Sequence, residues 1–185
     1  LRYHPALAGY RGYLYHEVWM NVSGSNLSSA ASVMAARPPN DVRLITSSQA
    51  PWFIDGGTGV LGDNYLERTR GYIVPDVTGG YRFSIAGDDD CELWLSTNDS
   101  PGRATRIARV TGWTGFQAFD SRAEQTSGTI NLEAGQSYYV QILHKEGGGG
   151  DHCSVSWIRP GTSNRVIIPS ANLRCLPVNF IEGGL

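Results

Sequence analysis

The chain has 185 residues, a formal net charge of −2 and 17% charged residues. Sparse, nearly balanced charge argues against nucleic acid and anionic membranes as partners, and no apolar run of about eighteen residues is present to insert into a bilayer. A chain of this length builds one sizeable core, so one domain is the default. The 23 glycines, 9 tyrosines and 5 tryptophans favour an all-β domain with many turns.

The first third of the chain predicts a strand, a helix and a second extended segment. Residues 13–21 are rich in aromatic side chains and predict a strand, while the alanine-rich residues 28–37 predict the one helix, which Pro38 and Pro39 end. Residues 42–47 follow as an extended segment. Because the chain begins at Leu1 and not at a methionine, a removed leader or flanking domain is left open.

A literal G-x-G-x-x-G occurs at Gly57, Gly59 and Gly62. In a nucleotide site this motif follows a buried strand and opens an apolar helix. Neither is predicted here, because residues 63–72 lead into Pro75 and residues 68–74 predict a strand. We therefore interpret the motif as a glycine-rich loop.

Three consecutive aspartates, Asp88, Asp89 and Asp90, lie between the alternating apolar runs 81–85 and 91–95, which predict the two strands of a central hairpin. Adjacent carboxylates repel one another, and an extended backbone sends neighbouring side chains to opposite faces. Calcium takes about six to eight oxygen ligands, and it would hold two adjacent carboxylates together if the peptide between them were bent or cis. A solvated acidic turn is the alternative, and the triplet alone leaves both open.

The second half of the chain predicts further strands and two loops. Residues 129–132 and 137–144 predict a hairpin, and four glycines at 147–150 lead into a last clear strand at 151–157. Trp113 is flanked on both sides by Thr-Gly pairs and lies in a loop. There it is a candidate for stacking on the ring of a ligand, with a structural role in the loop as the alternative.

The spacing of several motifs closely resembles the PA-fourteen domain family, which is named after the anthrax toxin protective antigen. The resemblance covers about residues 13–176. It rests on the segments Arg70-Gly71-Tyr72-Ile73-x-Pro75, Thr78-Gly79-x-Tyr81-x-Phe83-x-Ile85-x-Gly87-Asp88-Asp89, Glu92-Leu93-Trp94-Leu95-Ser96, Ala134-Gly135-x-x-Tyr138-Tyr139 and His144-Lys145-Glu146 through Asp151-His152 to Trp157. It implies one domain over residues 1–185, folded as an antiparallel β-sandwich or barrel with at most one or two short helices.

The resemblance also implies a calcium site. In lectin-like members, two aspartates joined by a cis peptide hold calcium, which binds vicinal sugar hydroxyls, and the matching pair is Asp88-Asp89. Asp90 stands where the family usually has a small residue, so it is not carried over as a ligand. A second loop completes the coordination, partly with carbonyls. This loop corresponds to residues 146–152, with ligands expected from Gly149, Gly150 and Asp151.

If the two loops meet over one ion, Cys91 and Cys153 become neighbours, either as a disulfide or as buried thiols, and Cys175 is the third cysteine. His152 is a further candidate ligand contact.

Three N-x-S/T motifs would be glycan acceptors in a secreted eukaryotic protein. Their asparagines are Asn21, Asn26 and Asn98.

We predict an extracellular, calcium-dependent carbohydrate-binding or adhesion module of a larger secreted or surface protein, with glycans or glycoproteins as partners. The alternative is a structural or protein-interaction module of the same fold, because some members of the family have no known sugar binding. The sequence has no Ser-His-Asp order, nucleophile elbow or H-E-x-x-H motif, so we predict that it is not an enzyme. Scattered carboxylates leave a glycosidase pair open.

Overall fold

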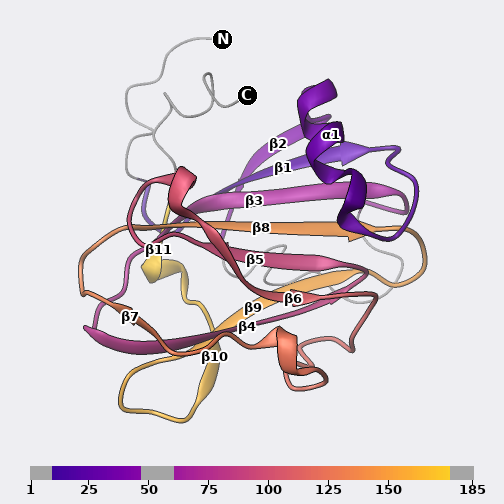
Figure 1. Ribbon diagram of the computed structural model, residues 1–185. Helices are drawn as coiled ribbons and strands as arrows, with labels where there is room; N and C mark the ends of the chain where they lie inside the picture. The colour runs from indigo at the N-terminus through magenta and orange to yellow at the C-terminus, as the bar shows by residue number, and fades with distance from the viewer. Residues whose placement is uncertain (1–9, 47–60, 176–185) are drawn as a thin grey trace.

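Two antiparallel sheets pack face to face around one core (Figure 1). The structure is a computed structural model that describes residues 10–46 and 61–175. The larger sheet contains, in spatial order, β2 (Asp41–Ile45), β1 (Leu14–Met20), β3 (Tyr65–Ile73), β8 (Tyr138–Glu146), β5 (Cys91–Leu95) and β6 (Thr105–Val110), with β11 (Leu173–Arg174) paired to β3. The smaller sheet contains, in order, β10 (Arg165–Ile167), β9 (His152–Ile158), β4 (Gly79–Asp88) and β7 (Ile130–Leu132). The predicted β-sandwich is confirmed.

The helical segments are short. α1 (Ala30–Ala36) is the one α-helix of the described residues and lies within the predicted range 28–37, and the single turn η2 (Leu27–Ser29) precedes it. Pro38 and Pro39 follow the helix directly, as expected for residues that cannot continue it. The described part of the chain has three further single turns: η3 (Pro101–Arg103), η4 (Ala123–Gln125) and η5 (Ser170–Asn172). Within the described ranges, no helix has the length and apolar character that crossing a bilayer requires.

The core follows from the period-two alternation of the strands. Alternate residues of β4 point inward, where Tyr81, Phe83 and Ile85 are fully buried. They meet inward residues of the neighbouring strands, among them Trp157 of β9, whose ring centroid lies 5.0 Å from that of Tyr81. In β8 the inward set includes Ile142, and the same parity carries on to His144 and Glu146, so this strand ends with polar side chains inside the sandwich.

Two predicted hairpins are wrong. β4 pairs with β9 and β7 in the smaller sheet, whereas β5 pairs with β8 and β6 in the larger one. The aspartate triplet therefore turns the chain from one sheet to the other. The predicted pairing of 129–132 with 137–144 fails in the same way, because β7 and β8 belong to different sheets. Local alternation identifies a strand, but it does not say which sheet the strand joins.

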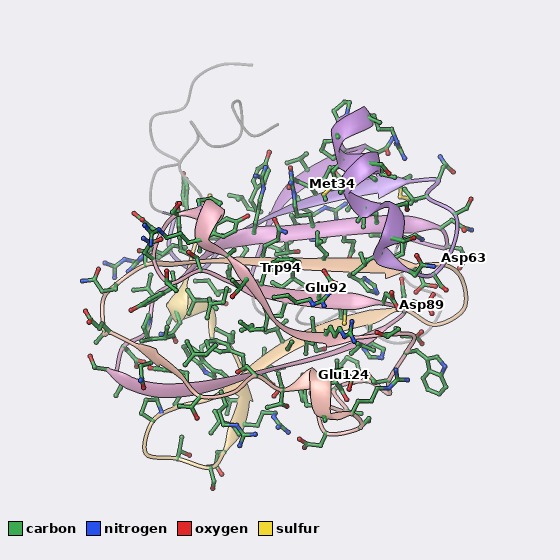
Figure 2. All side chains as sticks on the ribbon, in the orientation of Figure 1. Met34, Asp63, Asp89, Glu92, Trp94 and Glu124 are labelled. Carbon is green, nitrogen blue, oxygen red and sulfur yellow. The ribbon has the colours of Figure 1, made fainter. Side chains whose placement is uncertain are left out.

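The strand register brings the acidic segments to one end of the sandwich. Asp88 is the last residue of β4 and pairs with His152 at the start of β9. Glu146 is the last residue of β8 and pairs with Tyr65 at the start of β3. Figure 2 shows Asp89 at this end. Gly57 and Gly59 of the glycine-rich motif lie outside the described residues, and Gly62 is in the turn before β3.

Cys91 and Cys153 are neighbours, as expected, and they are free thiols in the structure and not a disulfide. Both are fully buried. They lie on β5 and β9, in opposite sheets, and the two thiols are close enough to influence each other's protonation. Burial, followed by the contact with Cys91, raises the pKa of the Cys153 thiol. Cys175 is apart from this pair, after β11, where its amide donates to the carbonyl of Tyr10.

The reactivity of these thiols gives a test of the buried pair. Because alkylation requires an accessible thiolate, Cys91 and Cys153 should resist iodoacetamide in the reduced native protein and react fully once the protein is unfolded. Mass spectrometry of the labelled peptides measures both. Labelling of either residue in the native protein at the rate of an exposed thiol would contradict the buried arrangement.

Candidate metal centre

Three carboxylates from two strand ends converge at one end of the sandwich. Ligand oxygens of Asp88, Asp89 and Glu146 lie within 4.8 Å of one another. The peptide bond between Asp88 and Asp89 is cis, as the family resemblance implies. The two aspartates are half-buried. Oxygen ligands of this kind suit a hard cation such as calcium.

Glu146 is the ligand candidate that the sequence analysis missed. Its residue exposure is 1%, and neither carboxylate oxygen has a hydrogen-bond partner among the described residues. A buried carboxylate without a partner is strongly disfavoured unless it is protonated or faces a cation. The alternation of the strand could have identified it. Glu146 is two residues after His144 and four after Ile142, so it faces inward at the last position of the strand.

The charges of the cluster act on one another. Burial, followed by the charge of Asp89, raises the pKa of Glu146 to about 7. The same two causes raise the pKa of Asp88. The nearest ammonium belongs to the buried Lys145, but it donates to the backbone carbonyl of Glu146 and to neither carboxylate oxygen. Burial lowers the pKa of Lys145, although the charges of Glu146 and Asp89 oppose this. A bound cation would compensate the cluster more directly.

A chain of buried polar side chains supports the backbone of the cluster from inside. His144 donates to the carbonyl of Asp88 over 2.7 Å and to Glu67 over 3.0 Å. His16 Nε2 lies 3.5 Å from the other oxygen of Glu67, and its Nδ1 is hydrogen-bonded to Thr69. Although burial opposes the protonated form, Glu67 raises the pKa of His144 to about 9, so His144 is a cation at neutral pH and donates at both nitrogens.

The glycine tract passes directly over Asp89. The amide of Gly147 donates to Asp89 Oδ2 over 3.0 Å. A Cβ at Gly147 would lie 3.0 Å from Ser25 Cβ and 3.1 Å from Asp89 Oδ2, so only glycine fits without a shift. Gly149 has a φ of +113°, which favours glycine. Whether the carbonyls of Gly149 and Gly150 bind a cation stays a prediction.

Asp151 is beside the cluster and outside the group of three. It is 1% exposed, and its Oδ2 accepts a hydrogen bond of 2.6 Å from the hydroxyl of Tyr65. Its Oδ1 is buried and has no partner among the described residues. Burial raises the pKa of Asp151, and its charge in turn raises that of Glu146. The free oxygen keeps Asp151 as a candidate ligand.

A loop after β6 stands next to the cluster and presents an aromatic ring. Thr114 is hydrogen-bonded to the end of β4, because its amide donates to the carbonyl of Gly87 over 2.8 Å. The neighbouring Trp113 is 63% exposed. Arg122 donates to the carbonyls on either side of Gly112, those of Thr111 and Trp113. The Trp113 ring is therefore exposed on a backbone that is held at several points.

His152 lies behind this loop and is 3% exposed. Its Nε2 is hydrogen-bonded to the carbonyl of Thr114 over 2.8 Å, and its ring meets Phe116 edge-on, with 5.6 Å between centroids. Burial lowers the pKa of His152. In this position His152 supports the loop, and its direct contact with a ligand stays a prediction.

Removing the charge of Glu146 should stabilise the cation-free protein. The Glu146 carboxyl has a pKa of about 7 in the folded protein, against an ordinary value of 4.5. Its protonated form therefore contributes stability that is fully present below pH 4.5. This stability is lost as the pH rises through 7, because the folded protein must then bury a charge. In chelator at pH 8, Glu146→Gln should raise the free energy of unfolding by about 1–3 kcal/mol. The two proteins should converge near pH 4.5.

Denaturant unfolding at a series of pH values measures this difference. The matched control is Glu124→Gln, at an exposed position in η4 that Figure 2 labels, and it should change stability by less than about 0.5 kcal/mol. A Glu146→Gln protein less stable than wild type in chelator at pH 8 would mean that the protein itself compensates the Glu146 charge.

A comparison with curated proteins corrects one prediction. The chain is 39% identical over 111 residues to N-acetyl-beta-glucosaminyl-glycoprotein 4-beta-N-acetylgalactosaminyltransferase 1 of Mus musculus, a match that covers 56% of this chain and 11% of that enzyme. The prediction that the chain is not an enzyme is therefore wrong. It relied on missing catalytic motifs, and their absence from one domain does not exclude a reaction carried out by a larger protein that contains the domain.

Solved structures resemble the whole described fold. The PA14 sugar-binding domain of an RTX adhesin has a TM-score of 0.64 and 15% identity, with 90% of this chain and 100% of that chain covered. The epithelial adhesin 9 A domain of Candida glabrata, solved in complex with Galβ1-3GlcNAc, has a TM-score of 0.65 and 12% identity, with 98% and 95% covered. At these identities the likeness shows the fold alone.

The sequence match to a known family is more direct. Residues 55–171 match the PA14 domain, which is more than half of the chain. This range contains the aspartate pair, Glu146 and the glycine tract. The chain belongs to the PA14 domain family.

Proposed function

We propose that the chain is a calcium-dependent carbohydrate-binding module of an extracellular protein. The observation that carries the proposal is the group formed by Asp88, Asp89 and Glu146, in which both oxygens of the buried Glu146 carboxylate lack a partner among the described residues. A concentration of negative charge that the protein leaves uncompensated fits a bound cation better than a solvated acidic turn.

The donor set fits calcium. Asp88, Asp89 and Glu146 would hold it, and Asp151 Oδ1 and the carbonyls of Gly149 and Gly150 are further candidates. All are hard oxygen donors, and the set contains no thiolate or imidazole of the kind that zinc prefers. When bound there, calcium supplies open coordination positions for two neighbouring hydroxyls of a sugar. Such sites in extracellular modules are filled at calcium concentrations of about 10⁻⁴–10⁻³ M.

The loop beside the cluster supplies the second half of a sugar site. Sugar rings have an apolar face that packs on an aromatic ring. Trp113 offers such a ring at 63% exposure, and its backbone is already ordered by Arg122, Thr114 and His152. A preordered contact loses less entropy when the ligand binds. Trp113 would therefore orient the sugar while the carboxylates hold the cation.

The comparisons support a glycan as the partner. Solved relatives of the same fold include a domain named as sugar-binding and a domain in complex with a galactose-containing disaccharide. The asparagines of the three N-x-S/T motifs are exposed, which an extracellular glycoprotein requires: they are Asn21, Asn26 and Asn98. Glycosylation at these positions and secretion are part of the proposal.

Calcium should stabilise the wild-type protein and should do so far less in Asp89→Asn. Calcium at 100 times its dissociation constant adds about 2.7 kcal/mol, which raises Tm by about 5–10 °C for a domain of this size. Asp89→Asn keeps the side-chain shape and removes one ligand charge, so calcium affinity should fall by at least about tenfold. Calorimetry with calcium and with chelator measures both, and an equal Tm of the wild type in both conditions would refute the cation site.

Trp113→Ala should separate sugar binding from calcium binding. Calcium affinity should stay within about twofold, while the affinity for a glycan selected on an array should fall by about 1–3 kcal/mol if the ring stacks on the sugar. Tyr13→Ala, which removes another exposed ring at the far end of β1, is the control and should change neither affinity. Titration calorimetry of the three proteins measures these values.

The same array decides between the proposal and a structural or protein-interaction module. A glycan signal that chelator abolishes and excess calcium restores supports the proposed function. Calcium stabilisation without any glycan signal would favour the structural module. Glycan binding that survives both chelator and Asp89→Asn would place the sugar on another face of the domain.

A further inference from the structure

Asp90, the third residue of the triplet, binds the protein's own backbone with both side-chain oxygens. Its Oδ1 accepts a hydrogen bond of 2.6 Å from the amide of Gly112, and its Oδ2 accepts one of 3.3 Å from the amide of Leu27. These two amides are far apart in the sequence and belong to two different loops. Asp90 is not in the group of three carboxylates that could hold a metal ion.

The backbone of Asp90 makes two more connections. Its amide donates to the carbonyl of Ser25 over 3.4 Å, and its carbonyl accepts a hydrogen bond of 2.9 Å from the amide of Lys145. One residue thus joins three segments: the loop at 24–27, the loop at 111–114, and the end of β8.

Each of these segments borders the carboxylate cluster. β8 carries Glu146, and the loop at 24–27 packs against Gly147, whose amide binds Asp89. The loop after Gly112 carries Trp113. Figure 1 shows the same arrangement, with the segment before α1 reaching the end of β8. A rigid link at the residue after Asp89 therefore sets where the two loops stand relative to the cluster.

We propose that Asp90 is a positioning residue, which holds the loops at 24–27 and 111–114 around the carboxylate cluster and does not itself bind the cation. Hydrogen bonds from amides to a carboxylate are charge-assisted and stronger than neutral ones, so a single side chain suffices to order both loops. The inference that Asp90 also places the Trp113 ring for a ligand rests on the proposed function. The ordering of the loops does not, because the four hydrogen bonds of Asp90 involve none of the proposed cation ligands.

The test compares the full chain with Asp90→Asn by amide hydrogen exchange in chelator. The asparagine keeps the shape but turns one acceptor into a donor, so one of the two loop amides loses its partner, and the hydrogen bond to the other is no longer charge-assisted. Exchange in the peptides that cover 24–27 and 111–114 should accelerate by at least about tenfold, while exchange in β3 and β8 stays unchanged. Calcium affinity, read from the shift in Tm, should stay within about threefold, whereas Asp89→Asn lowers it.

Asp99→Asn is the matched control. Asp99 is exposed in the turn after β5, whereas Asp90 directly precedes that strand. The control should leave exchange in both loops unchanged. Three results would overturn the proposal: unchanged loop exchange in Asp90→Asn, equal acceleration in loops and core strands, or a loss of calcium affinity as large as that of Asp89→Asn. If wild type binds neither calcium nor glycan, the proposed function fails, and loop exchange in chelator still decides the role of Asp90.

With a glycan selected on the array, Asp90→Asn should weaken binding by about tenfold at unchanged calcium affinity, because the Trp113 loop is no longer held. An unchanged glycan affinity together with accelerated loop exchange would overturn the part of the proposal that concerns the ligand and support the part that concerns the loops.

Discussion

The mutual repulsion of Asp88, Asp89 and Glu146 is the constraint around which one end of the molecule is built. Their oxygens lie within 4.8 Å of one another, and at an effective dielectric constant of about 20 each pair of charges at that distance costs roughly 3–4 kcal/mol. The sandwich holds them together because the strands that end in Asp88 and Glu146 are fixed by long ladders, β4 to β9 and β8 to β3. The strain is relieved by protons or by a cation.

The protein's own positive groups surround the cluster without neutralising it. The protonated His144 binds the carbonyl of Asp88 and the carboxylate of Glu67, and Lys145 binds the carbonyl of Glu146. Both cations are thus engaged with the backbone of the site, and the carboxylate oxygens of Glu146 stay unpartnered among the described residues. An arrangement that orders the backbone and leaves ligand oxygens free is what a preorganised metal site requires.

Membership in the PA14 family gives the fold and does not by itself give the function, because the same fold occurs in proteins of different activities. One curated relative is an enzyme of which this chain matches 11%, and one solved structure of the same fold is named as a sugar-binding domain. These two facts agree if the domain is a unit that larger proteins use beside other domains. The prediction against an enzyme relied on catalytic motifs that are missing from this sequence, and the match to an enzyme contradicts it.

Although it missed the short strands β10 and β11, the sequence by itself determined most of the strands, the position of the helix, the family and the aspartate pair. Each of these depends on local information: alternation in β4 and β9, an alanine-rich run stopped by Pro38, and a specific motif around Asp88 and Asp89. Trp113 was also placed in a loop correctly, because glycines flank it closely.

Only the tertiary structure decided which strands pair, and three results depend on that pairing. β4 and β5 lie in different sheets, so the triplet is a turn between sheets and not a hairpin. The ladder of β8 with β3 and β5 points Glu146 into the site, although it is distant from the aspartates in sequence. Asp90, which the family resemblance did not carry over as a ligand, accepts hydrogen bonds from the amides of Leu27 and Gly112 with its side-chain oxygens. Long-range pairing is set by packing of the whole core, and no local pattern contains that information.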